Sequence, residues 1–163
     1  MIAKNVFLVA IVFFLMESHC GESASLNNKV DYSYLLGENY MVDYSNPYNM
    51  RSEAVRQCEL AGMHLLSIET DGEWEAVKLW ILINGVYWGN FWTSAVKEAG
   101  STRWVWESSG EEVTNFHWSK SQPTLGFSDT VKHCIGFSVE LGGWYDYVCN
   151  EESLSYFCEK EES

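Results

Sequence analysis

The first half of the chain contains two stretches whose apolar residues recur at the spacing of an amphipathic helix. In the first, from about Met50 to Ala61, an apolar position returns every three to four residues, which predicts a helix with Cys58 on its buried face. We expect Asn49 to cap the N-terminus of this helix and Gly62 to end it. The apolar positions are Ala54, Cys58 and Ala61.

The second helical stretch begins with a capping box. The run Thr70-Asp71-Gly72-Glu73 has the pattern Ser/Thr-x-x-Glu, in which the first and last side chains each bind a backbone N–H of the other residue. Beyond it, Trp74, Val77 and Ile81 mark one apolar face. The pattern therefore predicts a helix that ends near Asn84-Gly85.

Short aromatic or alternating runs elsewhere predict strands. Ser109-Gly110 marks a turn after one of them, and the polar His117 separates two aromatic residues in another. Because helices come first and strands follow, the order favours an α+β fold over repeated β-α-β units. The expected strands lie in Tyr32–Tyr44 (one or two strands), His64–Ile68, Phe91–Thr93, Trp104–Trp106 and Phe116–Trp118.

A hairpin is expected near the C-terminal end. Two apolar runs flank Gly142-Gly143, which predicts a tight reversal. Cys134 and Cys149 lie just outside these runs, so they could face each other and close a loop of 15 residues. Such a closure stabilises the fold by about 3 kcal/mol in the chain-entropy model. Before the hairpin, the polar stretch Ser119–Lys132 has the length of a functional or disordered loop.

The first twenty residues differ from the rest. Lys4 precedes the apolar run Val6–Leu15, and Ser18-His19-Cys20 permits cleavage, which together predict a secretory signal peptide over residues 1–20. The apolar run is too short to span a bilayer, so we expect no membrane insertion. Residues 21–35 read as a polar leader, 36–160 as one domain and 161–163 as an acidic tail.

Cleavage after residue 20 would leave an even number of cysteines. Cys20 would be lost, and four cysteines in a secreted domain predict two disulfides in one of three pairings. The sequence alone does not choose among the pairings. The remaining cysteines are Cys58, Cys134, Cys149 and Cys158.

Charge and motifs exclude several functions. The net charge of −13 argues against binding to nucleic acid or to anionic membranes. The sequence has no Gly-x-Ser-x-Gly, His-Glu-x-x-His or glycine-rich phosphate loop, and its acids are too scattered to propose a glycosidase pair. We therefore expect a secreted, non-enzymatic protein.

A series of aromatic and cysteine-containing motifs follows in order along the chain. The motifs are Ala54-Val55-Arg56-Gln57-Cys58, Phe91-Trp92-Thr93, Trp104-Val105-Trp106-Glu107-Ser108-Ser109-Gly110, Asn115-Phe116-His117-Trp118, Gln122-Pro123, Trp144-Tyr145-Asp146-Tyr147-Val148-Cys149 and Phe157-Cys158. In order and spacing the series resembles the C-type lectin-like domain family, and in size it is similar to short secreted single-domain lectins of invertebrates, of the insect type. The resemblance implies two helices, a small antiparallel sheet, a long loop region, and the disulfides Cys58–Cys158 and Cys134–Cys149.

The resemblance also implies a sugar site held by calcium, which prefers six to eight oxygen ligands. Gln122 and Asp146 carry ligand oxygens, whereas Thr124 is a poor substitute. Lys132 and Tyr145 depart from the family pattern, and an ammonium 4 Å from the metal position costs roughly 4 kcal/mol per unit of metal charge at an effective dielectric of 20. We therefore expect no cofactor and no working calcium site of the family type.

Two hypotheses concern what replaces the ion. The Lys132 ammonium is expected to lie beside the Asp146 carboxylate and to neutralise it, if both residues lie at the same end of the hairpin. Asp129 would supply a missing carboxylate only in a rearranged loop. In the plainer interpretation, Gln122-Pro123-Thr124 is a turn and Asp146 holds the loop by hydrogen bonds.

Two functions of different classes remain open. One is binding of glycans on microbes or host cells, with a role in innate immunity as the speculative setting. The other is a calcium-independent interaction with a protein partner on the same fold, because a fold does not settle function. The aromatic residues Trp104, Trp106, Trp118 and Trp144 are expected in the core rather than as sugar platforms, and His64, His117 and His133 on the surface or in strands.

Overall fold

The computed structural model describes residues 39–43, 49–86, 88–124 and 130–160. The expected signal peptide, leader, acidic tail and Asp129 lie outside the described residues, as do residues 32–38 and 44 of the strand region expected over Tyr32–Tyr44. Within the described part of the chain, no helix is both long and apolar enough to cross a membrane.

The first helix, α3, spans Arg51–Leu60, close to the predicted range. The expected Asn49 cap is wrong: the capping position is Met50, which makes no side-chain cap hydrogen bond. Asn49 instead belongs to the short strand β2 (Asn49–Met50), and its carbonyl accepts a hydrogen bond from the Trp92 indole at 3.0 Å. Ala61 was expected on the buried face but is exposed, because the helix has already ended at Leu60.

The second helix, α4, spans Asp71–Ile83 and has the predicted capping box. The Thr70 hydroxyl accepts from the Glu73 N–H at 3.2 Å, and a Glu73 carboxylate oxygen accepts from the Thr70 N–H at 2.9 Å. The predicted apolar face is also confirmed. Its buried residues are Trp74, Val77, Trp80 and Ile81.

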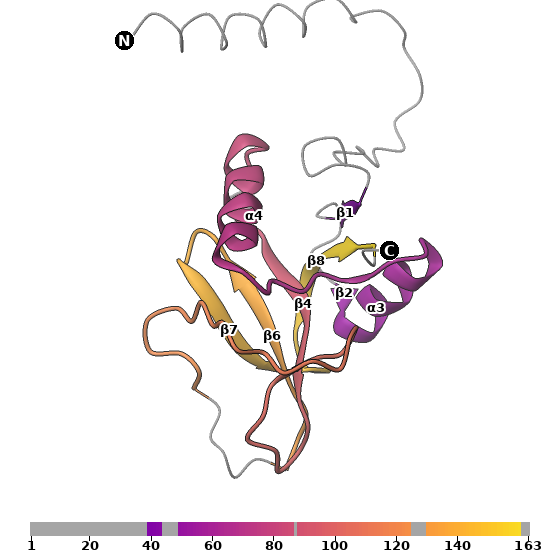
Figure 1. Ribbon diagram of the computed structural model, residues 1–163, viewed down its shortest axis with the longest axis vertical. Helices are drawn as coiled ribbons and strands as arrows, with labels where there is room; N and C mark the ends of the chain where they lie inside the picture. Colours follow the sequence, from indigo (N-terminus) through magenta and orange to yellow (C-terminus); the bar gives the residue numbers. More distant parts are fainter. Residues whose placement is uncertain (1–38, 44–48, 87, 125–129, 161–163) are drawn as a thin grey trace, which may run out of the picture.

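The strands form a twisted sheet in the order β1-β8-β4-β6-β7 (Figure 1). The small strands β2 and β3 pair with β8, and β5 pairs with β4. The pairings between these strands are antiparallel, as expected, except that of β4 with β8, which is parallel. The strand bounds are β1 Tyr40–Asp43, β3 His64–Leu65, β4 Asn90–Lys97, β5 Val105–Trp106, β6 His133–Ser138, β7 Gly143–Val148 and β8 Ser153–Glu159.

The two helices cover opposite faces of the sheet. Side chains alternate between faces along a strand, and neighbours on β4 accordingly enter different cores: Phe91 packs in the cluster that contains Trp74 of α4. Trp92 packs in the cluster that contains Cys58 of α3. Figure 1 shows α3 and α4 on either side of β4 and β8. The sheet therefore separates the two cores, one on each face. Strand β7 lies at one edge of the sheet.

Both implied disulfides are present. Cys58–Cys158 joins α3 to β8 across 100 residues, and Cys134–Cys149 joins the ends of the β6–β7 hairpin across 15 residues. The hairpin itself reverses over residues 139–142, beside the predicted glycine pair. Covalent closure thus fixes the base of the hairpin that carries two of the expected site residues.

Candidate functional site

The site lies where the segment after Trp118 runs along the edge strand β7. The Trp144 N–H donates to the His117 carbonyl at 2.8 Å, and the Ser119 N–H donates to the Trp144 carbonyl at 3.0 Å. This short parallel bridge between Trp118 and Trp144 brings the beginning of the long loop beside the middle of β7. These backbone hydrogen bonds therefore place two expected site segments, near residue 122 and near residue 146, side by side.

Asp146 is the centre of this edge. Its side chain is buried, and one carboxylate oxygen accepts from the Thr124 N–H at 2.8 Å and from the Thr124 hydroxyl at 3.2 Å. The Asp146 N–H in turn points to the Gln122 side-chain oxygen at 3.5 Å. The structure thus brings together three of the five expected residues, Gln122, Thr124 and Asp146. We call these three residues the recognition edge.

Tyr145 lies apart from the recognition edge. Its hydroxyl lies 3.0 Å from the Leu141 carbonyl and 2.7 Å from the Ser119 hydroxyl. Because neighbouring side chains on a strand point to opposite faces, Tyr145 faces away from the side that Asp146 occupies. It therefore contributes to the start of the loop rather than to the group around Asp146.

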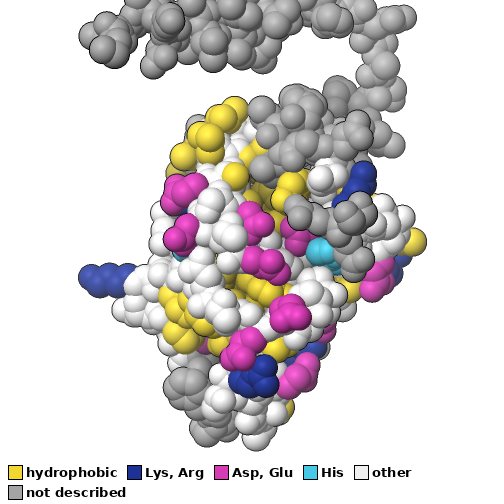
Figure 2. Space-filling view, in the orientation of Figure 1, with side chains coloured by type: hydrophobic (Ala, Val, Ile, Leu, Met, Phe, Trp, Pro, Cys, Tyr) yellow, Lys and Arg dark blue, Asp and Glu magenta, His cyan; other side chains and the backbone are white. Residues whose placement is uncertain are grey.

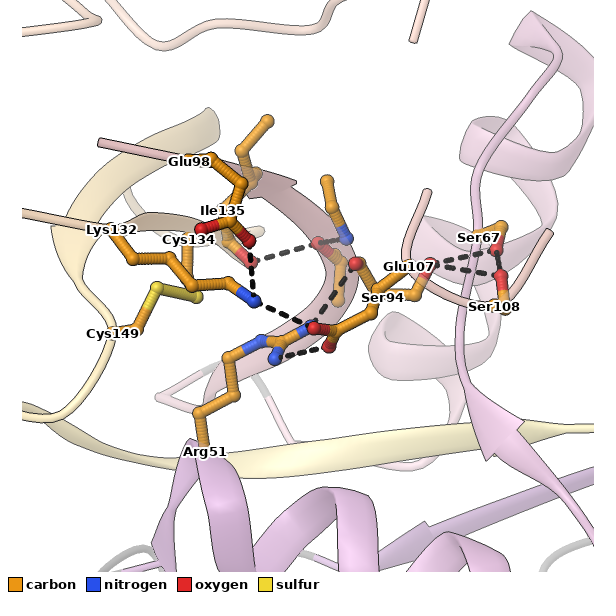
Figure 3. A network of polar contacts seen from close by, with 12 residues as sticks. Arg51, Ser67, Ser94, Glu98, Glu107, Ser108, Lys132, Cys134, Ile135 and Cys149 are labelled. Carbon is orange, nitrogen blue, oxygen red and sulfur yellow. Dashed lines mark hydrogen bonds and ion pairs between the residues drawn. A yellow bond between two sulfur atoms is a disulfide. The ribbon is translucent and has the colours of Figure 1, made fainter. Parts of the chain in front are cut away.

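The expected pair between Lys132 and Asp146 is wrong. The Lys132 ammonium lies 2.7 Å from a Glu107 carboxylate oxygen and 2.9 Å from a Glu98 oxygen (Figure 3). The register of the hairpin explains this, since Asp146 pairs with Ile135, three residues beyond Lys132. Lys132 also has the strand parity of Cys134, which faces the α3 core, whereas Ile135 faces the α4 core.

Glu107 binds a second cation through its other oxygen. The Arg51 guanidinium donates to it at 2.7 Å and to the Ser94 carbonyl at 3.0 Å. We call the group of Arg51, Glu98, Glu107 and Lys132 the Lys132 network. Sequence reasoning assigned no role to its first three members, because both Arg51 and the two glutamates lie far from Lys132 along the chain. One local signal points to Arg51. It is a cation at the first helical position, directly before the buried apolar face of α3.

The network favours the charged forms of Glu107 and Lys132. Burial raises the pKa of Glu107, but hydrogen bonds and charges from Lys132 and Arg51 outweigh burial, so the pKa lies below its ordinary value. Burial likewise lowers the pKa of Lys132, but the two glutamates outweigh it and the net pKa is raised. Lys132 therefore stays a cation at the end of the long loop.

The described residues do not fit the calcium ion that the family implies. Calcium requires several carboxylates or carbonyls converging on one point, but the only carboxylate in the recognition edge already accepts two hydrogen bonds from Thr124. Nowhere among the described residues does a group of three or more His, Cys, Asp or Glu side chains have the arrangement to hold a metal. The ligand roles of Gln122 and Asp146 therefore stay predictions.

The tryptophans and histidines mostly follow the plainer expectation. Trp104, Trp106 and Trp144 are buried, and Trp144 lies at the centre of several edge-to-face ring contacts. His117 stacks on Trp74 at 5.4 Å instead of facing solvent, while its neighbour Phe116 is exposed. His133 lies in β6 and is fully buried. His133 in β6 and His117 beside α4 therefore contribute to packing.

A second feature that the sequence did not indicate is a cavity of about 330 Å³ at the other edge of the sheet. It is lined by His64, Glu69, Glu73 and Glu159, among others. Acidic side chains are also more widespread than basic ones on the face shown in Figure 2. Burial raises the pKa of Glu159 to about 7, with further contributions from the Glu73 and Glu69 charges, although the Ser67 N–H opposes the shift.

The family model of the Lectin C-type domain matches residues 49–160. The chain is 29% identical over 111 residues to a perlucin-like protein of Mytilus galloprovincialis, covering 65% of this chain and 67% of that protein. It is 27% identical over 158 residues to lymphocyte antigen 75 of Mus musculus, covering 97% of this chain but only 8% of that much longer protein. Among solved structures, the mouse scavenger receptor C-type lectin carbohydrate-recognition domain has a TM-score of 0.57 at 24% identity, covering 76% of this chain and 90% of that domain.

Proposed function

This chain belongs to the C-type lectin domain family, and from that premise we propose that it is a non-enzymatic module that binds glycans through the recognition edge without calcium. The supporting observation is that Gln122, Thr124 and Asp146 converge on one edge and hydrogen-bond to one another. Their oxygens and N–H groups are of the kind that bind sugar hydroxyls, and a domain of this fold in the mouse is named for carbohydrate recognition.

The calcium-free form of the proposal rests on where the other two residues point. Lys132 is bound by Glu98 and Glu107, and Tyr145 by Ser119 and Leu141, so neither faces Asp146. Hydrogen bonds from Thr124 stabilise the negative charge of the Asp146 carboxylate, as a bound cation would otherwise do. A sugar would then be held by direct hydrogen bonds. This favours weak binding to a single monosaccharide unit and tighter binding to a glycan that presents several such units.

A protein partner is the second candidate, and the hydrogen bonding within the recognition edge favours it. Because Thr124 already occupies the Asp146 carboxylate, fewer acceptor positions remain for sugar hydroxyls than an open site would offer. We further infer an extracellular setting, since disulfides persist mainly in oxidising compartments. The signal peptide and a role in innate immunity belong to the same proposal.

A glycan array with and without EDTA tests the function. We expect the chain to bind one class of glycan equally in both conditions, and Gln122→Ala and Thr124→Val to weaken that binding. Thr114→Val, at an exposed threonine away from the edge, is the matched control and should bind normally. Absence of binding to any glycan, with all variants folded, would favour the protein-partner function.

Thermal unfolding with and without calcium tests the calcium-free part of the proposal. A ligand at 100 times its Kd adds about 2.7 kcal/mol to the free energy of unfolding, which raises the Tm of a domain of this size by several degrees. We expect millimolar calcium to leave the Tm unchanged. A rise of several degrees that Asp146→Ala abolishes would show that the calcium-free proposal is wrong.

A further inference from the structure

The Lys132 network joins three regions that are far apart in the sequence, since Glu98 and Glu107 lie close together along the chain. Arg51 begins α3, Glu98 follows β4, Glu107 follows β5, and Lys132 directly precedes β6 (Figure 3). Glu107 lies at the centre, with one oxygen 2.7 Å from Arg51 and the other 2.7 Å from Lys132. The network therefore connects the returning end of the long loop to the body of the domain.

Lys132 is held through its backbone as well as its side chain. Its carbonyl accepts a hydrogen bond from the Cys149 N–H at 3.3 Å, just beyond the end of β7. The ammonium thus ties the loop end to Glu98 and Glu107, while the carbonyl ties it to the strand that carries Asp146. A change at the Lys132 side chain should therefore alter the protection of a single backbone amide, that of Cys149.

The two halves of the network differ in exposure. The Arg51 side chain is 7% exposed, whereas the side chains of Lys132 and Glu98 are 34% and 64% exposed. Salt screens exposed pairs far more than buried ones, and the screening length falls from about 8 Å at physiological ionic strength to about 3 Å at 1 M. The contacts of Lys132 therefore respond to salt, while the contact between Arg51 and Glu107 responds little.

We propose that Lys132 is a positioning residue, whose ammonium fixes the returning end of the long loop on Glu98 and Glu107 and makes that end sensitive to ionic strength rather than to calcium. The proposal deepens the proposed function and rests on it for its biological meaning. Two cations and two carboxylates balance one another, so this arrangement needs no added ion to be neutral. Binding at the recognition edge would then weaken in high salt and be indifferent to EDTA.

Hydrogen exchange of the Cys149 amide, measured at 0.05 M and 1 M NaCl, tests the positioning role without any ligand. In the unmodified chain we expect exchange to be about two- to fivefold faster at high salt, the range that exposed ion pairs support. Lys132→Met, which keeps the apolar stem, should exchange fast at both salt concentrations. The matched control Lys78→Met removes a lysine paired with Glu75 on α4 and should behave like the unmodified chain.

A charge exchange separates positioning from simple packing. Lys132→Glu alone should speed Cys149 exchange, and adding Glu98→Lys should restore both the slow exchange and its dependence on salt. A packing role alone would lower the Tm of Lys132→Met without any salt dependence in the unmodified chain, and that result would overturn the proposal. A chain that binds no glycan but shows the expected exchange pattern would contradict the proposed function and leave the positioning role intact.

Discussion

At the residue scale, Glu159 lies in an environment unlike that of an ordinary exposed carboxylate. One oxygen accepts from the Ser67 N–H at 2.7 Å and lies 3.5 Å from the His64 Nδ1. The Glu69 and Glu73 carboxylates line the same cavity. On the sheet, Glu159 pairs with both β1 and β3, so it lies where three strands meet.

The raised pKa of Glu159 predicts an unusual dependence of stability on pH. Because the pKa is about 7 in the folded protein and near 4.5 ordinarily, the native state holds the proton more tightly than the unfolded chain. The contribution to stability is thus complete below about pH 4.5 and is lost as pH rises through 7, amounting to on the order of 3 kcal/mol. Denaturation with urea at pH 5, 6, 7 and 8 measures it.

Glu159→Gln isolates this effect, since an amide oxygen still accepts from Ser67 but does not titrate. We expect the decline in stability between pH 5 and 8 to be much smaller in this variant. Glu152→Gln, at an exposed glutamate before β8, is the control and should keep the full decline. Equal pH profiles for the unmodified chain and Glu159→Gln would contradict the assignment.

At the element scale, the beginning of β7 depends on a glycine. Gly143 has a φ of 148°, and a Cβ there would lie 2.6 Å from the His117 carbonyl oxygen and 2.8 Å from the Ser119 nitrogen. Gly142 also has a positive φ, but a Cβ there would meet nothing within 4 Å. A side chain at position 142 would therefore add backbone strain alone, whereas one at position 143 would add strain and a steric clash.

We expect Gly143→Ala to destabilise the fold by about 3 kcal/mol or more, because it adds a clash with two backbone atoms to the strain. Gly142→Ala should cost only about 1–2 kcal/mol, the cost of the left-handed conformation alone. Thermal unfolding of both variants measures the difference. Equal losses would show that the segment from His117 to Ser119 does not pack against β7 as described.

The hairpin register yields a prediction about calcium. The variant Lys132→Glu with Tyr145→Asn restores two ligand types of the family, but we expect no calcium binding at Asp146. The reason is that residue 132 faces Glu98 and Glu107, while residue 146 pairs with Ile135 on the other face. Calorimetry with calcium checks this. Binding that Asp146→Ala removes would contradict the register argument, whereas binding that only Glu98→Gln removes would agree with it.

At the scale of the whole molecule, the fold was largely predictable from the sequence. Both helices, the capping box at Thr70 and the cysteine positions are local signals, and the order of motifs supplied the pairing. The partners of Lys132 were not predictable, because they depend on which face of β6 it occupies and on which distant glutamates reach that face. The cavity around Glu159 has the same origin, since its walls come from β3, α4 and β8.

The two disulfides should contribute unequally to stability. Cys58–Cys158 closes 100 residues and Cys134–Cys149 closes 15, which correspond to about 4.7 and about 3 kcal/mol in the chain-entropy model. We expect the double variant Cys58→Ala with Cys158→Ala to lose more stability than Cys134→Ala with Cys149→Ala. Urea denaturation of both measures this, and the reverse order would show that local packing outweighs loop closure.

The first and last described residues of the chain lie next to each other. The Lys160 N–H donates to the Asn39 carbonyl at 2.8 Å, and both residues adjoin the β1–β8 edge, across the sheet from β7. Both connections of such a domain to neighbouring chain segments lie at the same place on its surface. The domain can be inserted into another polypeptide, or repeated in tandem, without pulling its ends apart or covering the surface at the opposite edge. Copies joined in tandem through such ends would leave the recognition edge of each copy uncovered, so that several copies could bind a repetitive ligand at once.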